Sequence, residues 1–212
     1  MPTEILFIRH GQTAGNLTDR FYDEPECELT EIGRLQAALA GCELRREYFG
    51  RRVSEVYSSP YVRVRQTCKI AMSESGLKYR RILCDDRLME RSFAGLAGKY
   101  VNWDGSYNGF EDAISQAQYR AIWTYGSRSG ADFGIETMES LYDRTESFIV
   151  DISRRHPNGF VIVFSHGGLF RMFYGICKMW PKDGAFWSIK MLDNAGIARF
   201  TVRPGIRFFH GA

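Results

Sequence analysis

The sequence lacks several features that would place it in a specialised class of protein. None of its apolar stretches approaches the roughly 20 residues that a membrane-spanning helix needs. Neither charge sign dominates, because 28 Lys and Arg stand against 25 Asp and Glu. We therefore expect no membrane and no nucleic acid among its partners, and any anion site must come from cations that cluster locally.

Cysteine is present, but not in a pattern that builds a scaffold. The five cysteines are odd in number, widely spaced and free of any C-x-x-C pair. Reduced thiols in a cytoplasmic protein fit this pattern best. The chain enters a predicted strand almost at once, so we expect no signal peptide.

The predicted elements favour one α/β domain over residues 1–212. Strands alternate with helices, which is typical of a mostly parallel sheet. Residues 99–134 differ, because aromatic residues gather there with glycine and serine. We expect this segment to form an inserted cap over the carboxyl edge of the sheet, helical at about 110–125. Its aromatic side chains are expected mainly to form the cap's own small core.

Histidine is scarce, and two of the four histidines occupy equivalent places. The apolar runs Ile5–Ile8 and Phe160–Phe164 each suit a strand buried inside a parallel sheet. His10 and His166 follow these runs, and each precedes a glycine. Open α/β sheets bind ligands at the carboxyl ends of their strands. If the two strands are neighbours, both imidazoles face one crevice beside Arg9, although either histidine alone could be a capping or core residue.

Two stretches have clear helical periodicity. One begins after Thr30, a predicted N-cap, and carries an apolar stripe of the kind that faces a core: Ile32, Leu35, Leu39 and Cys42. The other runs from Glu136 to about Arg155. Further strands are predicted at 53–57, 81–84, 187–192 and 197–202, with a final edge strand at 206–209.

The residues at the strand mouths suit the handling of a phosphoryl group. Arg9 and Arg63 offer paired donors that match phosphate oxygens, and each charge-assisted hydrogen bond contributes roughly 1.5–3 kcal/mol. These cations should push His10 toward its neutral, nucleophilic form. His166 can then hold the oxygens on which charge develops. Glu90 is the best-placed acid to protonate a leaving alkoxide.

Other chemistries fit the same residues less well. His10, His166 and Glu90 could form a two-histidine, one-carboxylate metal site, but the neighbouring arginines argue against a bound cation. No cysteine lies near either histidine motif to make a nucleophile pair. No G-x-G-x-x-G follows the first strand, and no P-loop occurs.

Five stretches, in order along nearly the whole chain, resemble motifs of the histidine phosphatase superfamily, the phosphoglycerate mutase-like proteins. They are Arg9-His10-Gly11 with Thr13 and Asn16, Leu29-Thr30 with Gly33, Ser58-Ser59 with Arg63, Gln66 and Thr67, Leu88 with Glu90 and Arg91, and Ser165-His166-Gly167-Gly168 with Arg171. Glu136-Thr137, with Arg144 on the same helix, is similar to a further helix start of that family.

The resemblance implies a three-layer α/β/α sandwich and an enzyme that needs no metal. It implies that His10 is phosphorylated and that Glu90 acts as general acid and then as the base that activates water. The residues that it places around the phosphate are Arg9, Gln12, Asn16, Arg63, His166 and Gly167.

The cap departs from the mutase branch of this family, which usually carries an arginine pair there. Here the cap offers Lys99, Arg120 and Arg128 singly. We therefore expect a phosphatase that hydrolyses a small-molecule phosphomonoester with a partly apolar leaving group. A phosphoglycerate mutase or related phosphotransferase with the same phosphohistidine is the alternative, and a non-catalytic phospho-ligand binding module is a third. The oligomeric state stays open.

Overall fold

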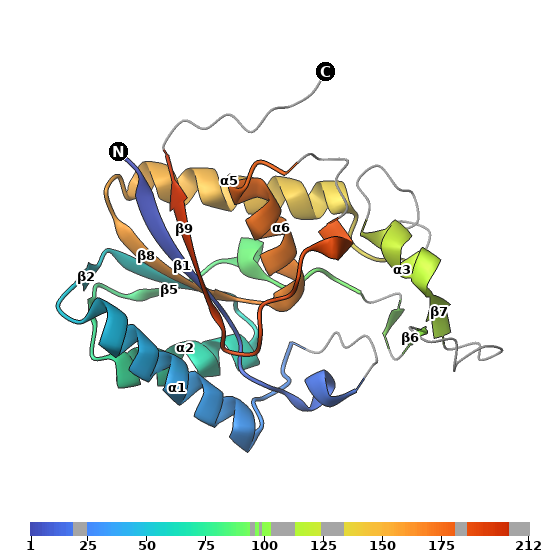
Figure 1. The fold of residues 1–212 in the computed structure, drawn as a ribbon, viewed down its shortest axis with the longest axis horizontal. Helices are drawn as coiled ribbons and strands as arrows, with labels where there is room; N and C mark the ends of the chain where they lie inside the picture. The colour runs from blue at the N-terminus through green and yellow to red at the C-terminus, as the bar shows by residue number, and fades with distance from the viewer. Residues whose placement is uncertain are drawn as a thin grey trace.

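A five-stranded sheet forms the centre of the computed structural model (Figure 1). The structure describes residues 1–18, 25–93, 96–97, 99–102, 113–123, 134–180 and 186–203. The predicted edge strand 206–209, Arg128 and much of the expected cap lie outside these ranges. The strands of the sheet, in spatial order, are β5 (Ile82–Cys84), β3 (Glu55–Ser58), β8 (Phe160–Ser165), β1 (Thr3–Arg9) and β9 (Ile197–Val202).

The sheet is mostly parallel, as predicted. β1 pairs in parallel with β8, β8 with β3 and β3 with β5, whereas β9 runs antiparallel to β1. Arg9 and Ser165 are paired across the β1–β8 ladder. The residues that follow them, His10 and His166, therefore leave neighbouring strands at the same edge of the sheet.

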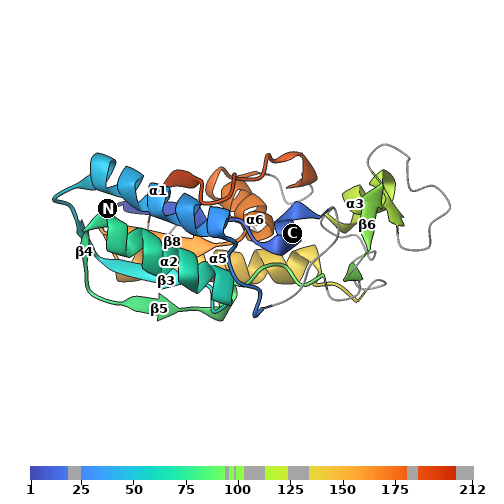
Figure 2. The ribbon, with the colours of Figure 1, turned by 90° about the horizontal axis from the view of Figure 1, so that it is seen from below.

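Helices cover both faces of the sheet and complete three layers (Figures 1 and 2). α1 (Glu31–Tyr48) and α2 (Val62–Ser75) lie on one face, where Leu6 and Ile8 of β1 point. α5 (Met138–Arg155) and α6 (Gly167–Cys177) lie on the other, where Ile5 and Phe7 point. Successive strand residues alternate between faces, so one buried strand supplies both cores. No helix in the described part of the chain is long and apolar enough to cross a membrane.

The first helix, α1, begins where it was predicted, but the face predicted to be buried points to solvent. Thr30 caps α1 by accepting from Gly33 N at 3.0 Å. The predicted stripe faces outward, because Ile32, Leu35 and Leu39 are 55%, 66% and 68% exposed, and Cys42 is exposed as well. The buried face consists of small residues and one leucine: Gly33, Ala37, Ala40, Gly41 and Leu44.

Close backbone packing explains this orientation. A Cβ on Gly41 would lie 2.5 Å from Ala71 O of α2, and a Cβ on Gly33 would lie 2.1 Å from Gln12 O. Only a small-residue face lets α1 approach these neighbours, so steric fit overrides the apolar pattern.

The predicted strand at 187–192 is wrong. A 3₁₀ turn, η4 (Phe186–Ser188), is followed there by irregular chain. Two carbonyl groups of this segment accept from arginine side chains instead of from a strand: Ile189 O from Arg171 Nε at 3.0 Å and Leu192 O from Arg9 Nη1 at 2.7 Å. A segment that binds the ends of two arginines in this way is fixed beside the site and does not extend the sheet.

The remaining elements are short. The predicted strand 53–57 is divided into β2 (Arg52–Val53), which pairs with β4 (Lys78–Tyr79), and β3. In the cap segment, β6 (Tyr100–Asn102) pairs with β7 (Ala113–Ser115), and α3 (Gln116–Ile122) follows. Figures 1 and 2 both show these elements at one end of the molecule, remote from β2 and β4.

Two 3₁₀ turns complete the described elements, η1 (Ala14–Leu17) after the first strand and η2 (Asp86–Leu88) before Glu90. Both lie in loops at the carboxyl edge of the sheet, where the site residues gather.

Candidate active site

The two histidines lie against each other at the carboxyl edge of the sheet. Their ring centroids are 5.3 Å apart with an interplanar angle of 67°, and both rings are buried. Nδ1 of His10 is 2.7 Å from Gly11 O. A carbonyl oxygen only accepts, so Nδ1 carries the hydrogen. In the neutral ring, Nε2 then keeps its lone pair.

Burial and nearby cations keep both imidazoles neutral. Burial is the largest cause that lowers the pKa of His10 well below 6.5, followed by the positive charges of Arg63 and Arg9. The pKa of His166 is lowered in the same direction by burial, then by Arg63 and by His10. The prediction that arginines favour neutral His10 is confirmed in direction, although desolvation contributes more.

The arginines come from the ends of two different elements. Arg9 ends β1, and its Nη1 donates to Leu192 O at 2.7 Å. Its buried Nε has no hydrogen-bond partner among the described residues. Arg63 lies in the first turn of α2, is buried, and has its Cζ 4.8 Å from the centroid of the Tyr61 ring. The Nε–H group of Arg9 is therefore available to donate a hydrogen bond to a ligand in the cavity.

Glu90 is held by backbone amides at the start of α6. Its Oε1 accepts from Arg91 N and Leu169 N, and its Oε2 accepts from Gly168 N, each at 2.9 Å. The first N–H groups of a helix lack partners within the helix, so they are free to bind an anion. A Cβ on Gly168 would lie 2.5 Å from Oε1, which explains why glycine stands at this position.

A cavity of about 200 Å³ brings most of these residues together. Arg9, His10, Asn16, Arg63, Glu90 and Gly167 line it, together with Thr13, Gly15, Phe93, Tyr119, Trp123, Gly168 and Met191. Gln12 and His166 are not among its lining residues. His166 is fully buried, with its Nε2 2.8 Å from Ser59 Oγ.

The loop that carries His10 is braced from both helices on its side of the sheet. Gly11 N donates to Thr67 Oγ1 of α2 at 3.0 Å. Gln12 N donates to Gln36 Oε1 of α1 at 2.8 Å, and the side chain of Gln12 accepts from Thr30 Oγ1 at 2.9 Å. The structure therefore places the Gln12 side chain on the helix start rather than in the cavity.

Asn194, which the sequence reasoning missed, fixes the other side of this loop. Its Nδ2 donates to Asn16 Oδ1 at 3.0 Å and to His10 O at 3.3 Å. Asn16 Oδ1 also accepts from Thr13 N at 3.0 Å. An asparagine in an irregular segment far along the chain gives no local signal, so only the fold could reveal this contact.

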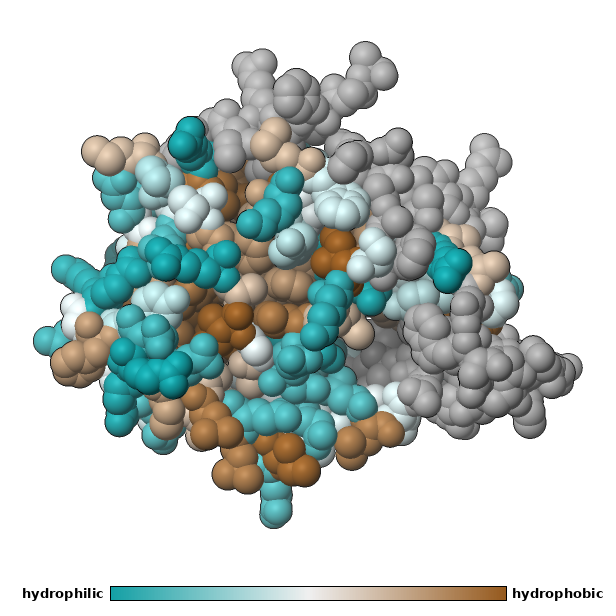
Figure 3. All heavy atoms as spheres, in the orientation of Figure 1, coloured by the Kyte–Doolittle hydropathy of each residue, from teal (hydrophilic) through white to brown (hydrophobic). Residues whose placement is uncertain are grey.

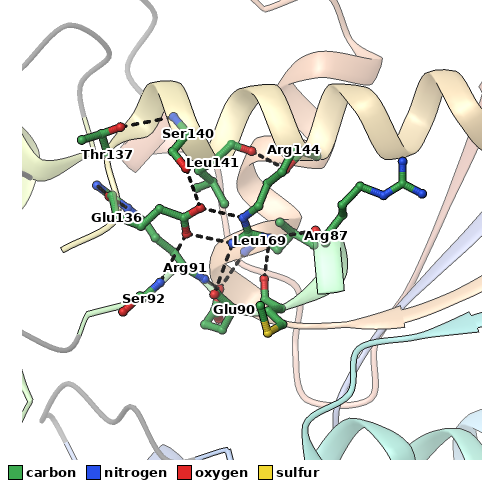
Figure 4. Close-up of polar contacts among 12 residues, drawn as sticks. Arg87, Glu90, Arg91, Ser92, Glu136, Thr137, Ser140, Leu141, Arg144 and Leu169 are labelled. Carbon is green, nitrogen blue, oxygen red and sulfur yellow. Dashed lines mark hydrogen bonds and ion pairs between the residues drawn. The ribbon is translucent and has the colours of Figure 1, made fainter. Parts of the chain in front are cut away.

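Glu136 and Arg144 form a clamp that holds the Glu90 segment (Figure 4). Arg144 makes a bidentate pair with Glu136, with Nε–Oε1 at 2.6 Å and Nη2–Oε2 at 2.8 Å. Its Nη1 donates to the carbonyls of Arg87 and Met89, and its Nη2 donates to Glu90 O at 3.2 Å. Glu136 and Arg144 therefore hold the backbone of the segment 87–90, which carries Glu90.

Two buried arginines, which lie outside the expected cap segment 99–134, pack against the aromatic wall of the cavity. The Cζ atoms of Arg91 and Arg171 are 4.9 and 5.1 Å from the centroid of the Trp123 ring. Arg171 Nη1 also donates to Tyr119 Oη at 2.8 Å. Burial lowers the pKa of Arg91 to about 10. One indication of this pair was present in the sequence: Arg91 follows Glu90 in one motif, and Arg171 belongs to the motif that contains His166.

In the described ranges, no group of three or more His, Cys, Asp or Glu side chains is placed to hold a metal ion. One end of the cavity is instead lined by two arginines and a neutral imidazole, with the Glu90 carboxylate beside them. Such a set can bind an anion and transfer a proton next to it.

Known proteins share sequence and fold with this chain. The profile of the histidine phosphatase superfamily (branch 1) matches residues 5–209. The chain is 34% identical over 172 residues to a 2,3-bisphosphoglycerate-dependent phosphoglycerate mutase of Methylobacterium radiotolerans, covering 79% of this chain and 75% of that protein. It is 29% identical over 196 residues to a putative phosphoserine phosphatase of Hydrogenobacter thermophilus, covering 91% of this chain and 86% of the relative.

A solved structure shares the fold. The mycobacterial glucosyl-3-phosphoglycerate phosphatase complexed with VO3 superposes with a TM-score of 0.71 at 20% identity, over 92% of this chain and 90% of that one. The chain belongs to the histidine phosphatase superfamily (branch 1) and is an enzyme of that superfamily, a phosphatase or a phosphoglycerate mutase-like protein.

Proposed function

We propose that the protein is a metal-independent phosphomonoesterase that works through a phosphohistidine on His10. The observation that carries this proposal is the hydrogen bond from His10 Nδ1 to Gly11 O. It leaves the Nε2 lone pair available on a ring that burial and two arginines keep neutral. A neutral imidazole that lines an arginine-rich cavity is suited to attack a phosphorus atom.

In the first step, His10 Nε2 forms a bond to phosphorus as the ester P–O bond breaks. The leaving alkoxide takes a proton from the carboxyl group of Glu90. Arg9 and Arg63 balance the charge on the phosphoryl oxygens. We assign a further hydrogen bond to Nδ1 of His166, which is buried behind the cavity lining without a partner among the described residues and can donate to these oxygens as charge develops. The products are an alcohol and phospho-His10.

In the second step, the Glu90 carboxylate removes a proton from water. The water oxygen bonds to phosphorus, the P–N bond breaks, and inorganic phosphate leaves. We assign the proton transfers to Oε2. Oε1 accepts two amide hydrogens, which occupy both of its lone pairs, whereas Oε2 accepts only the one from Gly168 N among the described residues.

The wall opposite the catalytic residues supports a leaving group that is partly apolar. Phe93, Tyr119 and Trp123 line this side of the cavity. We propose a small-molecule phosphomonoester as substrate, bound with its phosphate between the arginines and its alcohol portion against these side chains.

Phosphate release from a panel of phosphomonoesters, with chelator present, tests the proposal. We expect chelator-resistant turnover that His10→Ala abolishes. His156→Asn is the matched control, because His156 does not line the cavity and lies at the C-terminal end of α5, where its carbonyl accepts from Thr3 Oγ1 of β1 at 2.8 Å. Turnover that chelator abolishes, or that survives in His10→Ala, would contradict the mechanism.

A mutase that uses the same phosphohistidine is the second candidate. The buried pair Arg91 and Arg171, which both contact Trp123, favours it, because these cations lie behind the wall where a second acidic group of a substrate could bind. Product analysis with 2- and 3-phosphoglycerate separates the two reactions. Interconversion would identify a mutase, and phosphate release alone would identify a phosphatase. Phosphate-sensitive binding without any turnover would favour the binding module.

We keep the cytoplasm as the proposed location. All five cysteines are free thiols in the structure. Burial raises the pKa of the Cys68 thiol to about 12, so this cysteine is an unreactive core residue. Free thiols are typical of a reducing compartment.

A further inference from the structure

A buried hydrogen bond joins His166 to Ser59, a residue with no part in the proposed reaction steps. Hydrophilic side chains cover much of the surface that Figure 3 shows, but Ser59 and His166 are polar residues with no exposed surface. The Oγ atom of Ser59 is 2.8 Å from Nε2 of His166. Either group can donate in such a pair, so the direction of the bond decides which nitrogen of the imidazole ring carries the hydrogen.

The surroundings of Ser59 indicate which group donates. Its Oγ accepts from Tyr61 N at 3.4 Å, and the acceptor that the described residues offer to its hydrogen is Nε2 of His166. If the hydroxyl donates to Nε2, both hydrogen bonds of Ser59 are made. If Nε2 carried the hydrogen instead, the hydroxyl would have no acceptor in this part of the chain, and the lone pair of Nδ1 would be buried without a donor. Donation by Ser59 therefore satisfies more of the buried polar groups.

Donation by Ser59 places the single ring hydrogen of His166 on Nδ1. Burial above all lowers the pKa of His166 well below 6.5, so the ring is neutral and carries one hydrogen only. The ring of Tyr61 packs against His166 with a centroid distance of 5.0 Å and an interplanar angle of 75°, which restricts rotation of the imidazole. The hydrogen then lies on the nitrogen that has no partner among the described residues, in a ring whose centroid is 5.3 Å from that of His10.

We propose that Ser59 is a positioning residue that holds His166 in the tautomer with its hydrogen on Nδ1. The inference rests on the proposed phosphatase mechanism, in which this N–H donates to the phosphoryl oxygens. A donor that is oriented before the substrate binds stabilises the charge that develops on these oxygens. In the other tautomer, Nδ1 would present a lone pair to the same charge and repel it. Ser59 thus acts on the reaction through His166 and does not touch the substrate.

NMR of the ¹⁵N-labelled protein without substrate tests the tautomer. Long-range correlations between ring protons and ring nitrogens show which nitrogen carries the hydrogen, and His166→Asn identifies the signals. We expect the hydrogen on Nδ1 in the wild type and a mixture of both tautomers in Ser59→Ala. A hydrogen on Nε2 in the wild type, or an unchanged tautomer in Ser59→Ala, would overturn the proposal.

Ser75→Ala is the matched control for Ser59→Ala. Ser75 is also a fully buried serine, and its Oγ accepts from the amide two residues further on, Leu77 N, at 3.2 Å and donates to Met72 O at 2.8 Å. Both variants therefore lose one buried hydroxyl and leave one backbone amide without its acceptor. They should lose similar stability in thermal unfolding, but Ser75→Ala should leave the tautomer of His166 and kcat unchanged.

Steady-state kinetics test the effect on the reaction. Complete loss of an oxyanion donor costs about 10²–10³-fold in rate, and Ser59→Ala keeps the Nδ1–H form in part, so kcat should fall by about tenfold with a change in KM below about twofold. Ser59→Thr keeps the hydroxyl and should recover much of this loss. An intact kcat in Ser59→Ala, or an equal loss in Ser75→Ala, would overturn the positioning role. A wild type without turnover would contradict the proposed function alone, because the tautomer is measured without substrate.

Discussion

The two ends of the cavity are built in different ways. At the end that we propose to be catalytic, and call the catalytic end, His10, Arg63 and Glu90 are each placed by the end of a strand or the start of a helix. At the opposite wall, the side chains of Tyr119 and Trp123 come from a short cap helix and lie against Arg171. The first end is fixed by backbone geometry, whereas the second depends on side-chain packing. We expect chemistry to depend on the first and substrate choice to depend on the second.

Glu90→Gln should give the largest effect of the four changes below. The amide cannot transfer a proton as the carboxyl group does, so kcat should fall by about 10²–10⁴-fold. Steady-state phosphate release measures this loss. Glu43→Gln, an exposed change on α1, is the control. If Glu90→Gln left kcat unchanged, the assignment of the proton to the catalytic end would be wrong.

Arg144→Gln should lower kcat by about tenfold with little change in KM. Arg144 does not line the cavity but donates to the carbonyls of Arg87, Met89 and Glu90. Its loss should displace Glu90 slightly, which costs rate rather than binding. Arg144→Lys should recover only part of the activity, because lysine cannot make the bidentate pair with Glu136.

Arg155→Gln, on the same helix, is the control for Arg144→Gln. Arg155 is 59% exposed and pairs only with Asp151 among the described residues. A loss confined to thermal stability, with kcat intact, would show that the clamp is structural only.

The buried histidines should make the protein less stable in acid. In the unfolded chain, His10 and His166 protonate as the pH falls through 6.5, whereas in the folded protein both pKa values lie well below that. The unfolded state therefore binds more protons, and stability present above pH 6.5 is lost as the pH falls toward the folded pKa values, by up to about 1.4 kcal/mol per pH unit for each histidine.

Urea unfolding of the wild type and of His10→Asn at pH 7.5, 6.5 and 5.5 measures this loss. We expect a shallower dependence on pH in the variant. Equal slopes would mean that His10 is not held neutral, and the catalytic end would then lose its proposed nucleophile.

Tyr119→Phe should have the smallest effect of these changes. It removes the hydroxyl that accepts from Arg171 while keeping the ring in the wall. We expect a change of about two- to fivefold, in KM and different for different substrates. A uniform loss of kcat across the substrate panel would place Tyr119 in the chemistry and would remove the distinction between the two ends.

The positions of the residues at the catalytic end could be predicted from the sequence because each follows from the residues next to it. An apolar run followed by His10 or His166 indicates the mouth of a buried strand, and the parallel pairing of β1 and β8 then brings the two rings together. Thr30 was recognisable as a helix cap from its neighbours alone. Such signals lie within a few residues of the feature that they predict.

The parts that failed depend on contacts between distant segments. The apolar stripe of α1 predicted a core-facing side. The close packing of Gly41 against Ala71 instead places the opposite face of the helix in the core. The segment 187–192 resembles a strand, yet Arg9 and Arg171 bind its carbonyls. Asn194 contacts His10 from 184 residues away. No local pattern encodes such pairings.

Capture of a labelled enzyme intermediate would show directly whether His10 is the nucleophile. Glu90→Gln lacks the base that activates water, so it should hydrolyse phospho-His10 slowly. It also lacks the general acid, so the substrate must be an aryl phosphate, whose leaving group departs without a proton and still allows phospho-His10 to form. Mixing this variant with a ³²P-labelled aryl phosphate, denaturing it in alkali and mapping the peptides should place an acid-labile label on the peptide that contains His10. No label, or label on another residue, would contradict the mechanism.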